Sequence, residues 1–285
     1  MTKGLVLEGG GLRGLFSAGI MDVLMAHGVT FDGVVGVSAG ACFGCNYKSG
    51  QAGRVLRYNL RYAHDLRYCS LWSLLTTGGI FGPRFAYYTL PLHLDPFDTQ
   101  AFDANPMQFH LVTTDVQTGE PVYRRFDRYT DDMLDWILAS SSMPLVSRIV
   151  NIGDRQLLDG GIADSIPLRY FQQQGFERNL VVLTQPADYR KQPLRHLRLI
   201  RHLLRHHPRF LAAWEQRHEM YNAQLDYIAE QQRLGNALIL CPHHTLSIGR
   251  VSHNRRLMRE AYNEGSALAT SQLPRIKEFL SPTSH

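Results

Sequence analysis

Two short apolar runs, each followed by small residues and a helical pattern, constrain the fold more than any other feature. Residues 5–7 lead into a glycine-rich stretch at 9–14, and the apolar spacing over 13–26 is that of a helix. A second run, residues 33–37, ends at Ser38 and precedes a series of small residues. Apolar strands that alternate with helices are typical of a parallel sheet covered on both faces. The first 50 residues therefore predict an α/β protein.

Later segments continue this alternation of strands and helices. Residues 109–113 and 121–126 predict a strand pair around a turn at 117–120. Residues 133–140 predict a helix, and residues 180–184 predict another buried strand. We therefore expect a three-layer α/β/α architecture with a mostly parallel central sheet and a helical C-terminal part.

The same patterns divide the chain into two parts. Residues 1–185 are expected to form an α/β core. Residues 186–285 are expected to form a mostly helical extension, with a helical pattern over 190–233, that returns one strand at about 237–241 to the sheet. Two further helices are predicted, over residues 253–271 and 274–279.

Composition narrows the class of protein. The chain has 285 residues, of which 44% are hydrophobic and 19% charged, and this is ordinary for a globular protein. No apolar run approaches the ~18–20 residues that a membrane span requires. Only residues 1–4 precede the first predicted strand, which leaves no room for a signal peptide. We therefore expect a cytoplasmic protein.

The four cysteines do not predict a disulfide framework in a chain of this length. Cys42 and Cys45 form a C-x-x-C pattern, but a zinc site needs a second pair, and Cys69 and Cys241 stand alone. Two interpretations remain open. One is a redox pair; the other, which we favour, is a pair of small residues that pack a helix against the sheet.

The segment Gly36-Val37-Ser38-Ala39-Gly40 is a G-x-S-x-G motif. By average residue frequencies, such a pentapeptide occurs by chance in roughly one chain in ten of this length. Its setting strengthens it, because a nucleophile elbow needs an apolar strand before the serine and a helix after it. The alternative is that Ser38 only caps the following helix. A cap does not explain glycines on both sides, so we favour the elbow.

The glycines of the first loop permit two interpretations. They match G-x-G-x-x-G, the fingerprint of a dinucleotide site, which wants an acidic residue about 20 positions later at the end of the second strand. Asp32 lies 18 positions after Gly14 but precedes that strand, whose ligand-facing end is Ser38. The other interpretation is that backbone N–H groups at a helix start stabilise an oxyanion. We favour it for six residues: Gly9, Gly10, Gly11, Leu12, Arg13 and Gly14.

A nucleophilic serine needs a base, and the sequence offers many histidines after residue 195. In the α/β-hydrolase order, several strands precede the elbow, whereas only one strand–helix unit does so here. We therefore expect the adjacent histidine pairs to be surface or structural residues rather than catalytic ones: His206 with His207, and His243 with His244.

Three motifs in order resemble the patatin-like phospholipase family. They are the glycine loop at 9–14, the elbow at 36–40 and Asp159-Gly160-Gly161, which correspond to the family's G-G-G-x-R/K-G, G-x-S-x-G and D-G-G/A. Residues 139–144 resemble the family's A-S-x-x-x-P stretch, and Pro167 matches a family proline. Ser165 departs from the asparagine that many members have. The resemblance is strong over residues 5–167 and vague afterwards.

The resemblance implies a patatin-like fold, with residues 1–185 as the catalytic core, and a serine–aspartate dyad. Ser38 is then the nucleophile, Asp159 its base, and Gly160 and Gly161 let the backbone close around the carboxylate. A free aspartate has a pKa near 3.9 and is a weak base, so the site must be partly dry. The substrate implied is a fatty-acyl ester of a phospholipid or lysophospholipid, with no metal or organic cofactor.

Two other functions stay open at this point. In the first, the chain is a non-catalytic lipid-binding or regulatory member of the same fold. In the second, more distant alternative, it is a nucleotide-binding Rossmann-like protein. Residues 71–106, rich in aromatic and turn residues, form either a lid or acyl-chain wall, or ordinary packed loops and short helices.

The net charge of +5 is unevenly distributed, because residues 190–210 contain no acidic side chain. On a helix, this segment has an apolar face and a basic face: Leu197, Ile200, Leu203 and Leu204 against Arg198, Arg201 and Arg205. Such a helix binds the inner face of an anionic membrane or docks on the core with a solvated basic face, and we slightly favour docking. No recognition motif indicates a nucleic-acid partner.

Overall fold

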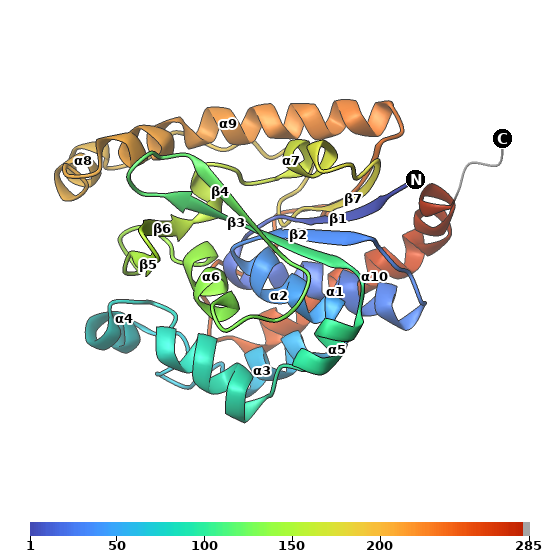
Figure 1. Cartoon of the computed structure of the whole chain (residues 1–285), viewed down its shortest axis with the longest axis horizontal. Coiled ribbons are helices and arrows are strands. Elements are labelled where there is room, and N and C mark those ends of the chain that lie inside the picture. Colours follow the sequence, from blue (N-terminus) through green and yellow to red (C-terminus); the bar gives the residue numbers. More distant parts are fainter. Residues whose placement is uncertain (282–285) are drawn as a thin grey trace.

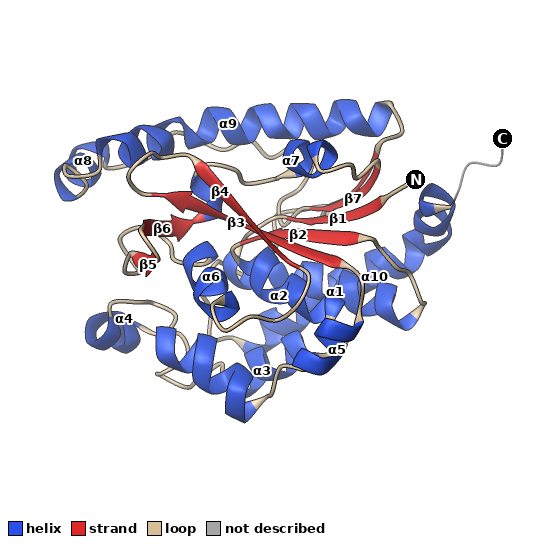
Figure 2. Ribbon diagram, in the orientation of Figure 1, coloured by secondary structure: helices blue, strands red, loops and turns tan. Residues whose placement is uncertain are grey.

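The computed structural model describes residues 1–281 and has a central sheet with helices on both faces (Figures 1 and 2). The strand order is β5-β6-β3-β2-β1-β7-β8, and β4 also pairs with β3. The neighbours from β3 to β8 in this order run parallel, whereas β4, β5 and β6 are antiparallel to their partners. The strands are β1 (Lys3–Leu7), β2 (Gly33–Val37), β3 (Gln108–Asp115), β4 (Pro121–Phe126), β5 (Val150–Ile152), β6 (Arg155–Asp159), β7 (Arg178–Val182) and β8 (Ala237–Leu240).

The helices range from single turns to two long rods. None in the described residues 1–281 is long and apolar enough to cross a membrane. They are η1 (Gly11–Gly14), α1 (Leu15–Ala26), α2 (Ala39–Lys48), α3 (Arg54–Arg61), α4 (Leu71–Thr77), η2 (Phe85–Leu94), α5 (Thr99–Ala104), α6 (Met133–Ser140), η3 (Gly160–Ile162), α7 (Leu168–Gln173), α8 (Leu197–Leu203), α9 (Pro208–Arg233) and α10 (Arg255–Leu280).

The two faces of the sheet bury separate cores, because successive side chains of a strand point in opposite directions. In β1, Leu5 and Leu7 belong to the core under α1, α2 and α10, whereas Val6 belongs to the core under α7 and α9. All three side chains are fully buried. The predicted three-layer α/β/α fold with a mostly parallel sheet is therefore confirmed.

The helical pattern over residues 190–233 was predicted as one region, and the structure corrects this. Residues 190–196 are not helical, α8 has only seven residues, and α9 begins at Pro208. Proline has no N–H to donate and fits the first turn of a helix but not its interior, so Pro208 starts a new helix. Ile200 is the buried residue of α8, while Leu203, expected on the same apolar face, is exposed.

The prediction of two C-terminal helices, broken before Pro274, was wrong. One helix, α10, runs through Pro274 and ends at Leu280. Ala269 and Ile276 are fully buried on either side of the proline, so packing holds the helix together across the missing hydrogen bond.

The last helix of the described chain, α10, crosses α1 at close range. A Cβ atom at Gly265 of α10 would overlap the carbonyl oxygen of Phe16, and one at Gly19 of α1 would overlap that of Tyr262. The crossing therefore requires glycine on both helices. It packs the C-terminal helix α10 against α1, the first α-helix.

Candidate active site

Two strands that share one edge of β3 bring the predicted nucleophile and base together. β2 pairs with β3 up to Val112, and β6 pairs with it from Thr113 onward, while β4 pairs along both stretches. Because β4 holds one edge of β3, β2 and β6 must meet end to end on the other. Val37, the last residue of β2, faces Val112, and Asp159, the last of β6, faces Thr113. Ser38 therefore lies beside Asp159.

Ser38 sits in the sharp turn that the elbow hypothesis requires. Its backbone has φ 55° and ψ −120°, a conformation that residues other than glycine rarely adopt. Helix α2 begins at the next residue. A Cβ atom at Gly36 would overlap the Gly40 carbonyl oxygen, and one at Gly40 would overlap that of Leu7. Close backbone approach therefore requires both motif glycines. Val37 is buried in the sheet, and Ala39 opens α2.

Ser140 braces this turn, a role that the sequence did not reveal. Its hydroxyl donates to the Val112 carbonyl oxygen at 2.7 Å and accepts from the Ser38 N–H at 3.0 Å. It is fully buried at the end of α6. The A-S-x-x-x-P resemblance was the only available signal, and it carried no contact information.

Asp159 is a buried carboxylate with a defined set of partners. Its side chain is 6% exposed, and its Oδ1 accepts from the Gly161 N–H at 2.8 Å. Burial raises the pKa of Asp159, while the charge of Arg217, the hydrogen bond with the Ser38 side chain and the Gly161 N–H oppose that rise. Gly160 allows the tight fit, because a Cβ atom there would overlap the Val112 carbonyl oxygen.

The glycine loop packs directly on the elbow. A Cβ atom at Gly9 would lie 2.9 Å from the Cβ of Ser38, and Gly11 has a φ of 57°. Within residues 1–281, the N–H groups of Gly9, Gly10 and Gly11 donate to no protein acceptor. They remain available to a ligand beside Ser38.

The other residues predicted for this loop have different contacts. The Leu12 N–H donates to the Arg250 carbonyl oxygen at 3.0 Å, and the Arg13 N–H donates to that of Gly10 at 3.3 Å. A Cβ atom at Gly14 would lie 2.9 Å from the Phe43 ring, so this glycine packs η1 against α2. The free amides are thus confined to the first three glycines.

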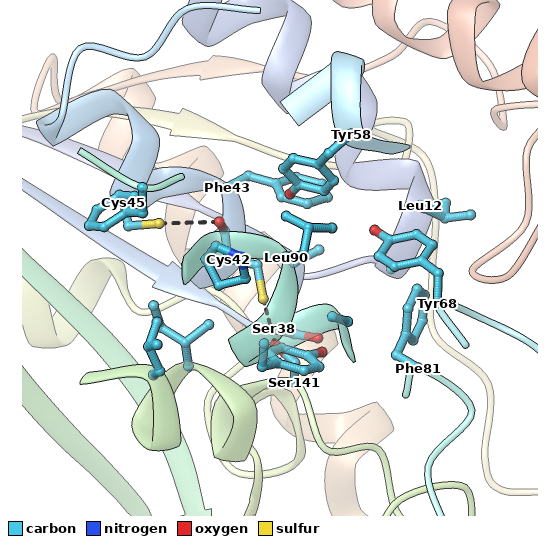
Figure 3. A pocket seen from close by; sticks show the side chains of 18 of the residues that line it. Leu12, Ser38, Cys42, Phe43, Cys45, Tyr58, Tyr68, Phe81, Leu90 and Ser141 are labelled. Atoms are coloured by element: carbon cyan, nitrogen blue, oxygen red, sulfur yellow. Dashed lines mark hydrogen bonds between the residues drawn. The ribbon is translucent and has the colours of Figure 1, made fainter. Parts of the chain in front are cut away.

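An apolar cavity extends from Ser38 into the protein (Figure 3). Its aromatic residues come from α2, α3, Tyr68 and the region 71–106 that is rich in aromatic and turn residues. Within that region η2 is a π-helix, and Leu90 points into the cavity. The labelled residues that surround the space are Leu12, Cys42, Phe43, Cys45, Tyr58, Tyr68, Phe81, Leu90 and Ser141.

A second, polar cavity of about 550 Å³ adjoins the first at Ser38. Ser38 and Asp159 line it together with residues 189–195, α9 and Arg250. The histidine in its wall is His218, whose Nδ1 lies 2.9 Å from the Glu215 carbonyl oxygen. His206, His243 and His244 are exposed, and His207 is half-buried; none of the four lines this cavity.

The C-x-x-C cysteines are free thiols with packing roles. The Cys45 thiol donates to the Cys42 carbonyl oxygen at 3.3 Å, and the Cys42 sulfur lies 2.9 Å from the Ser141 hydroxyl. Burial raises the pKa of Cys42 to about 11 and that of Cys45 to about 12. Both thiols are therefore protonated near neutral pH, which favours the packing interpretation over a redox pair.

Asp32 lies at the wrong end of β2 for a dinucleotide site. Its carboxylate accepts from the Lys3 N–H at 2.7 Å, and β2 starts at the next residue. Ser38 occupies the opposite end of the strand. The ribose contact that a Rossmann-type site requires at that end is absent from the described residues.

Comparison with family models gives two matches. The model of the family "Patatin-like phospholipase" matches residues 5–171. A second model, described as "Domain of unknown function (DUF6363)", matches residues 207–281.

Comparison with individual proteins gives partial matches. The chain is 31% identical over 192 residues to "Uncharacterized protein YjjU" of Escherichia coli, which covers 65% of this chain and 52% of that protein. It is 30% identical over 174 residues to "Uncharacterized NTE family protein Rv2565" of Mycobacterium tuberculosis, covering 58% and 27%. It is 27% identical over 186 residues to "Lysophospholipase nte1" of Aspergillus oryzae, covering 61% and 11%. The chain therefore spans about half the length of YjjU and a smaller share of the others.

Among solved structures, VipD from Legionella pneumophila is similar with a TM-score of 0.44 and 13% identity. The similarity covers 95% of this chain and 67% of that one.

Proposed function

The chain belongs to the patatin-like phospholipase family, and from that premise we propose that it cleaves fatty-acyl esters of phospholipids or lysophospholipids through Ser38 and Asp159. The observation that carries the proposal is the position of Ser38 and Asp159 side by side along β3, where an apolar and a polar cavity adjoin. A lipid ester has its acyl chain and its headgroup on opposite sides of the bond to be cleaved. The two cavities match that division.

The proposed reaction starts with attack of the Ser38 hydroxyl oxygen on the ester carbonyl carbon while Asp159 accepts the hydroxyl proton. The N–H groups of Gly9, Gly10 and Gly11 stabilise the oxyanion of the tetrahedral intermediate. The intermediate collapses, Asp159 gives the proton to the departing alcohol oxygen, and an acyl ester of Ser38 remains. Water then attacks this ester while Asp159 accepts a water proton; the bond between the Ser38 oxygen and the acyl carbon breaks, Asp159 returns the proton to that oxygen, and the fatty acid is released.

The environment of Asp159 suits this role. Burial raises the pKa of the carboxyl group and so makes the carboxylate a stronger base than a free aspartate. The Arg217 guanidinium opposes the rise and keeps the carboxylate in its ionised, proton-accepting form. Arg217 also donates from Nε to the Gly161 carbonyl oxygen, which fixes it beside the base loop.

A membrane surface is the proposed source of the substrate. In Figure 1, α4 and α8 lie on the side of the molecule where β1 and β2 end. Both helices expose large apolar side chains: Leu71, Trp72 and Leu75 on α4, and Leu199 and Leu203 on α8. Arg198 and Arg205 are exposed beside the latter pair. Apolar and basic residues together are the composition that binds an anionic interface.

A fluorophosphonate probe tests the enzymatic role, since it labels only an activated serine. We expect labelling at Ser38 and a loss of up to ~10⁶-fold in chromogenic ester hydrolysis for Ser38→Ala. His218→Ala is the matched control, because His218 lines the polar cavity without a place in the dyad. An unlabelled Ser38 would indicate a non-catalytic lipid-binding member of the family. A loss in His218→Ala equal to that in Ser38→Ala would instead indicate a histidine base.

A further inference from the structure

We propose that the polar cavity beside Ser38 is an anion subsite that selects acyl esters whose phosphate headgroup carries no positive charge. This inference rests on the proposed hydrolase function and narrows its substrate class. It assigns the headgroup side of the site to residues outside the matched range 5–171, namely Lys191, Arg217 and Arg250.

The charges that line the cavity are unbalanced. Its cations are Arg13, Arg190, Lys191, Arg195, Arg217 and Arg250, and its two carboxylates are Glu8 and Asp159. Arg190 is ion-paired with Asp226 at 2.9 Å. Within residues 1–281, none of the other five cations forms an ion pair with a carboxylate.

Neither carboxylate is within ion-pair distance of these side chains in the described residues. Glu8 is 4% exposed, and its oxygens accept from the Thr184 N–H at 2.6 Å, the Thr184 hydroxyl at 3.1 Å and the Tyr221 hydroxyl at 2.7 Å. Asp159 accepts from the Gly161 N–H at 2.8 Å and lies beside Ser38. Two carboxylates against five cations without an ion pair leave the cavity with an excess of positive charge among the groups of residues 1–281.

Arg13 and Lys191 show that the buried cations of this cavity lack favourable partners. The Arg13 Nε is buried and has no hydrogen-bond partner within residues 1–281. Burial lowers the pKa of Lys191 to about 7, with further lowering by Arg217, Arg250 and Arg13, against which Glu8 acts in the opposite direction. A phosphate bound here would supply the missing partner and favour the charged form of Lys191.

The same residues disfavour a choline headgroup. Quaternary ammonium ions bind in aromatic cages, and the rings in the wall of this cavity are those of Tyr189 and Trp214. The Lys191 ammonium already lies 4.1 Å from the Tyr221 ring centre and 5.7 Å from that of Tyr189. A choline cation at either ring of the cavity wall would be repelled by Lys191, Arg217 and Arg250, which line the same space.

The position of the cavity identifies the anion as part of the substrate. Ser38 lines both this space and the apolar cavity, so an ester bond at Ser38 directs its acyl chain to one side and its alcohol to the other. The alcohol of a phosphate-bearing lysolipid places its phosphate a few atoms from the ester. Arg250 also contacts the glycine loop through its carbonyl oxygen, which accepts from the Leu12 N–H.

The test compares three esters with the same acyl chain: lysophosphatidic acid, lysophosphatidylcholine and monoacylglycerol. We expect wild-type kcat/KM to be highest for lysophosphatidic acid. In Lys191→Gln and Arg250→Gln, its advantage over monoacylglycerol should fall by on the order of ten- to a hundredfold, mainly through KM. Lys191→Arg keeps the charge and should restore most of the advantage. Arg275→Gln, an exposed change on α10, is the matched control and should alter no ratio.

Outcomes separate this inference from the proposed function. Retained hydrolysis in Ser38→Ala refutes the proposed function, whereas an unchanged substrate ratio in Lys191→Gln and Arg250→Gln refutes only the anion subsite. A preference for lysophosphatidylcholine refutes it as well. Calorimetric titration of Ser38→Ala supplies a readout without turnover: lysophosphatidic acid should bind more tightly than inorganic phosphate. Equal affinities would mean that the cavity holds free phosphate and not a lipid headgroup.

Discussion

Ser38 and Asp159, the residues proposed to carry the chemistry, are both held in a way that costs folding free energy. Ser38 has a positive φ, a conformation worth about 1–3 kcal/mol of strain in a residue other than glycine. Asp159 is a carboxylate whose pKa is raised by burial. The hydrogen bond from the Ser38 N–H to the Ser140 hydroxyl and the pairing of β6 with β3 hold these two residues in place.

Asp159→Asn should therefore stabilise the protein while removing its activity. A raised folded-state pKa means that wild-type stability falls as pH rises from about 3.8 through that pKa, and asparagine does not titrate. We expect a higher melting temperature at pH 7, a difference that shrinks towards pH 4, and a loss of activity on the order of 10⁴-fold. Melting curves across this pH range check it. A lower melting temperature at pH 7 would show that the ionised carboxylate is net stabilising.

At the scale of elements, the crossing of α1 and α10 unites the two ends of the chain. Gly19 and Gly265 let the helix backbones touch, and the Asn254 side chain caps α10 by accepting from the N–H groups of Arg256 and Leu257. The first of these helices follows the glycine loop directly. Packing at the crossing therefore supports the loop that lies against Ser38.

Gly265→Ala should weaken this crossing. The added methyl group meets the Phe16 carbonyl oxygen, which belongs to backbone and cannot rotate away. We expect a loss of about 1–3 kcal/mol in the free energy of unfolding, measured by urea denaturation. Ser271→Ala, on an exposed position of the same helix, should change it by less than about 0.5 kcal/mol. Equal effects of the two substitutions would contradict close packing as the cause.

The sequence predicted elements well where a local pattern determines them. The hairpin of β3 and β4 and the buried strands β1 and β2 follow from apolar runs and turn residues. Residues 190–196 were misjudged because arginines and leucines at helical spacing do not show whether a segment packs as a helix. Pro274 was misjudged because burial of Ala269 and Ile276, a tertiary effect, decides whether a helix continues through a proline.

At the scale of the whole molecule, the sequence predicts only those site residues that a short motif marks. Ser38 and Asp159 were predicted because short motifs mark them. Lys191, Arg217 and Arg250 have no motif, and only the fold brings them to one cavity. The division into a core of 1–185 and an extension of 186–285 stays a prediction.

The proposed membrane binding belongs to this scale, because it would depend on the face that several elements form together. We expect Arg198→Gln with Arg205→Gln to reduce co-sedimentation with anionic vesicles by on the order of tenfold. Arg201 is left unchanged, because it is ion-paired with Glu215 at 2.8 Å. Arg275→Gln with Lys277→Gln removes the same charge near the end of α10 and should leave binding unaltered. If both pairs behave alike, α8 is a docked helix with a solvated basic face.

The order of strands in the sheet has a consequence for synthesis on the ribosome. β1 pairs on one side with β2, which emerges soon after it, and on the other with β7, which begins at Arg178. A nascent chain therefore exposes one bare edge of β1 during most of its translation. The carbonyl of Arg250, which fixes Leu12, arrives later still. A polypeptide released early carries the serine without the finished loop, so truncated products should lack the proposed hydrolase activity.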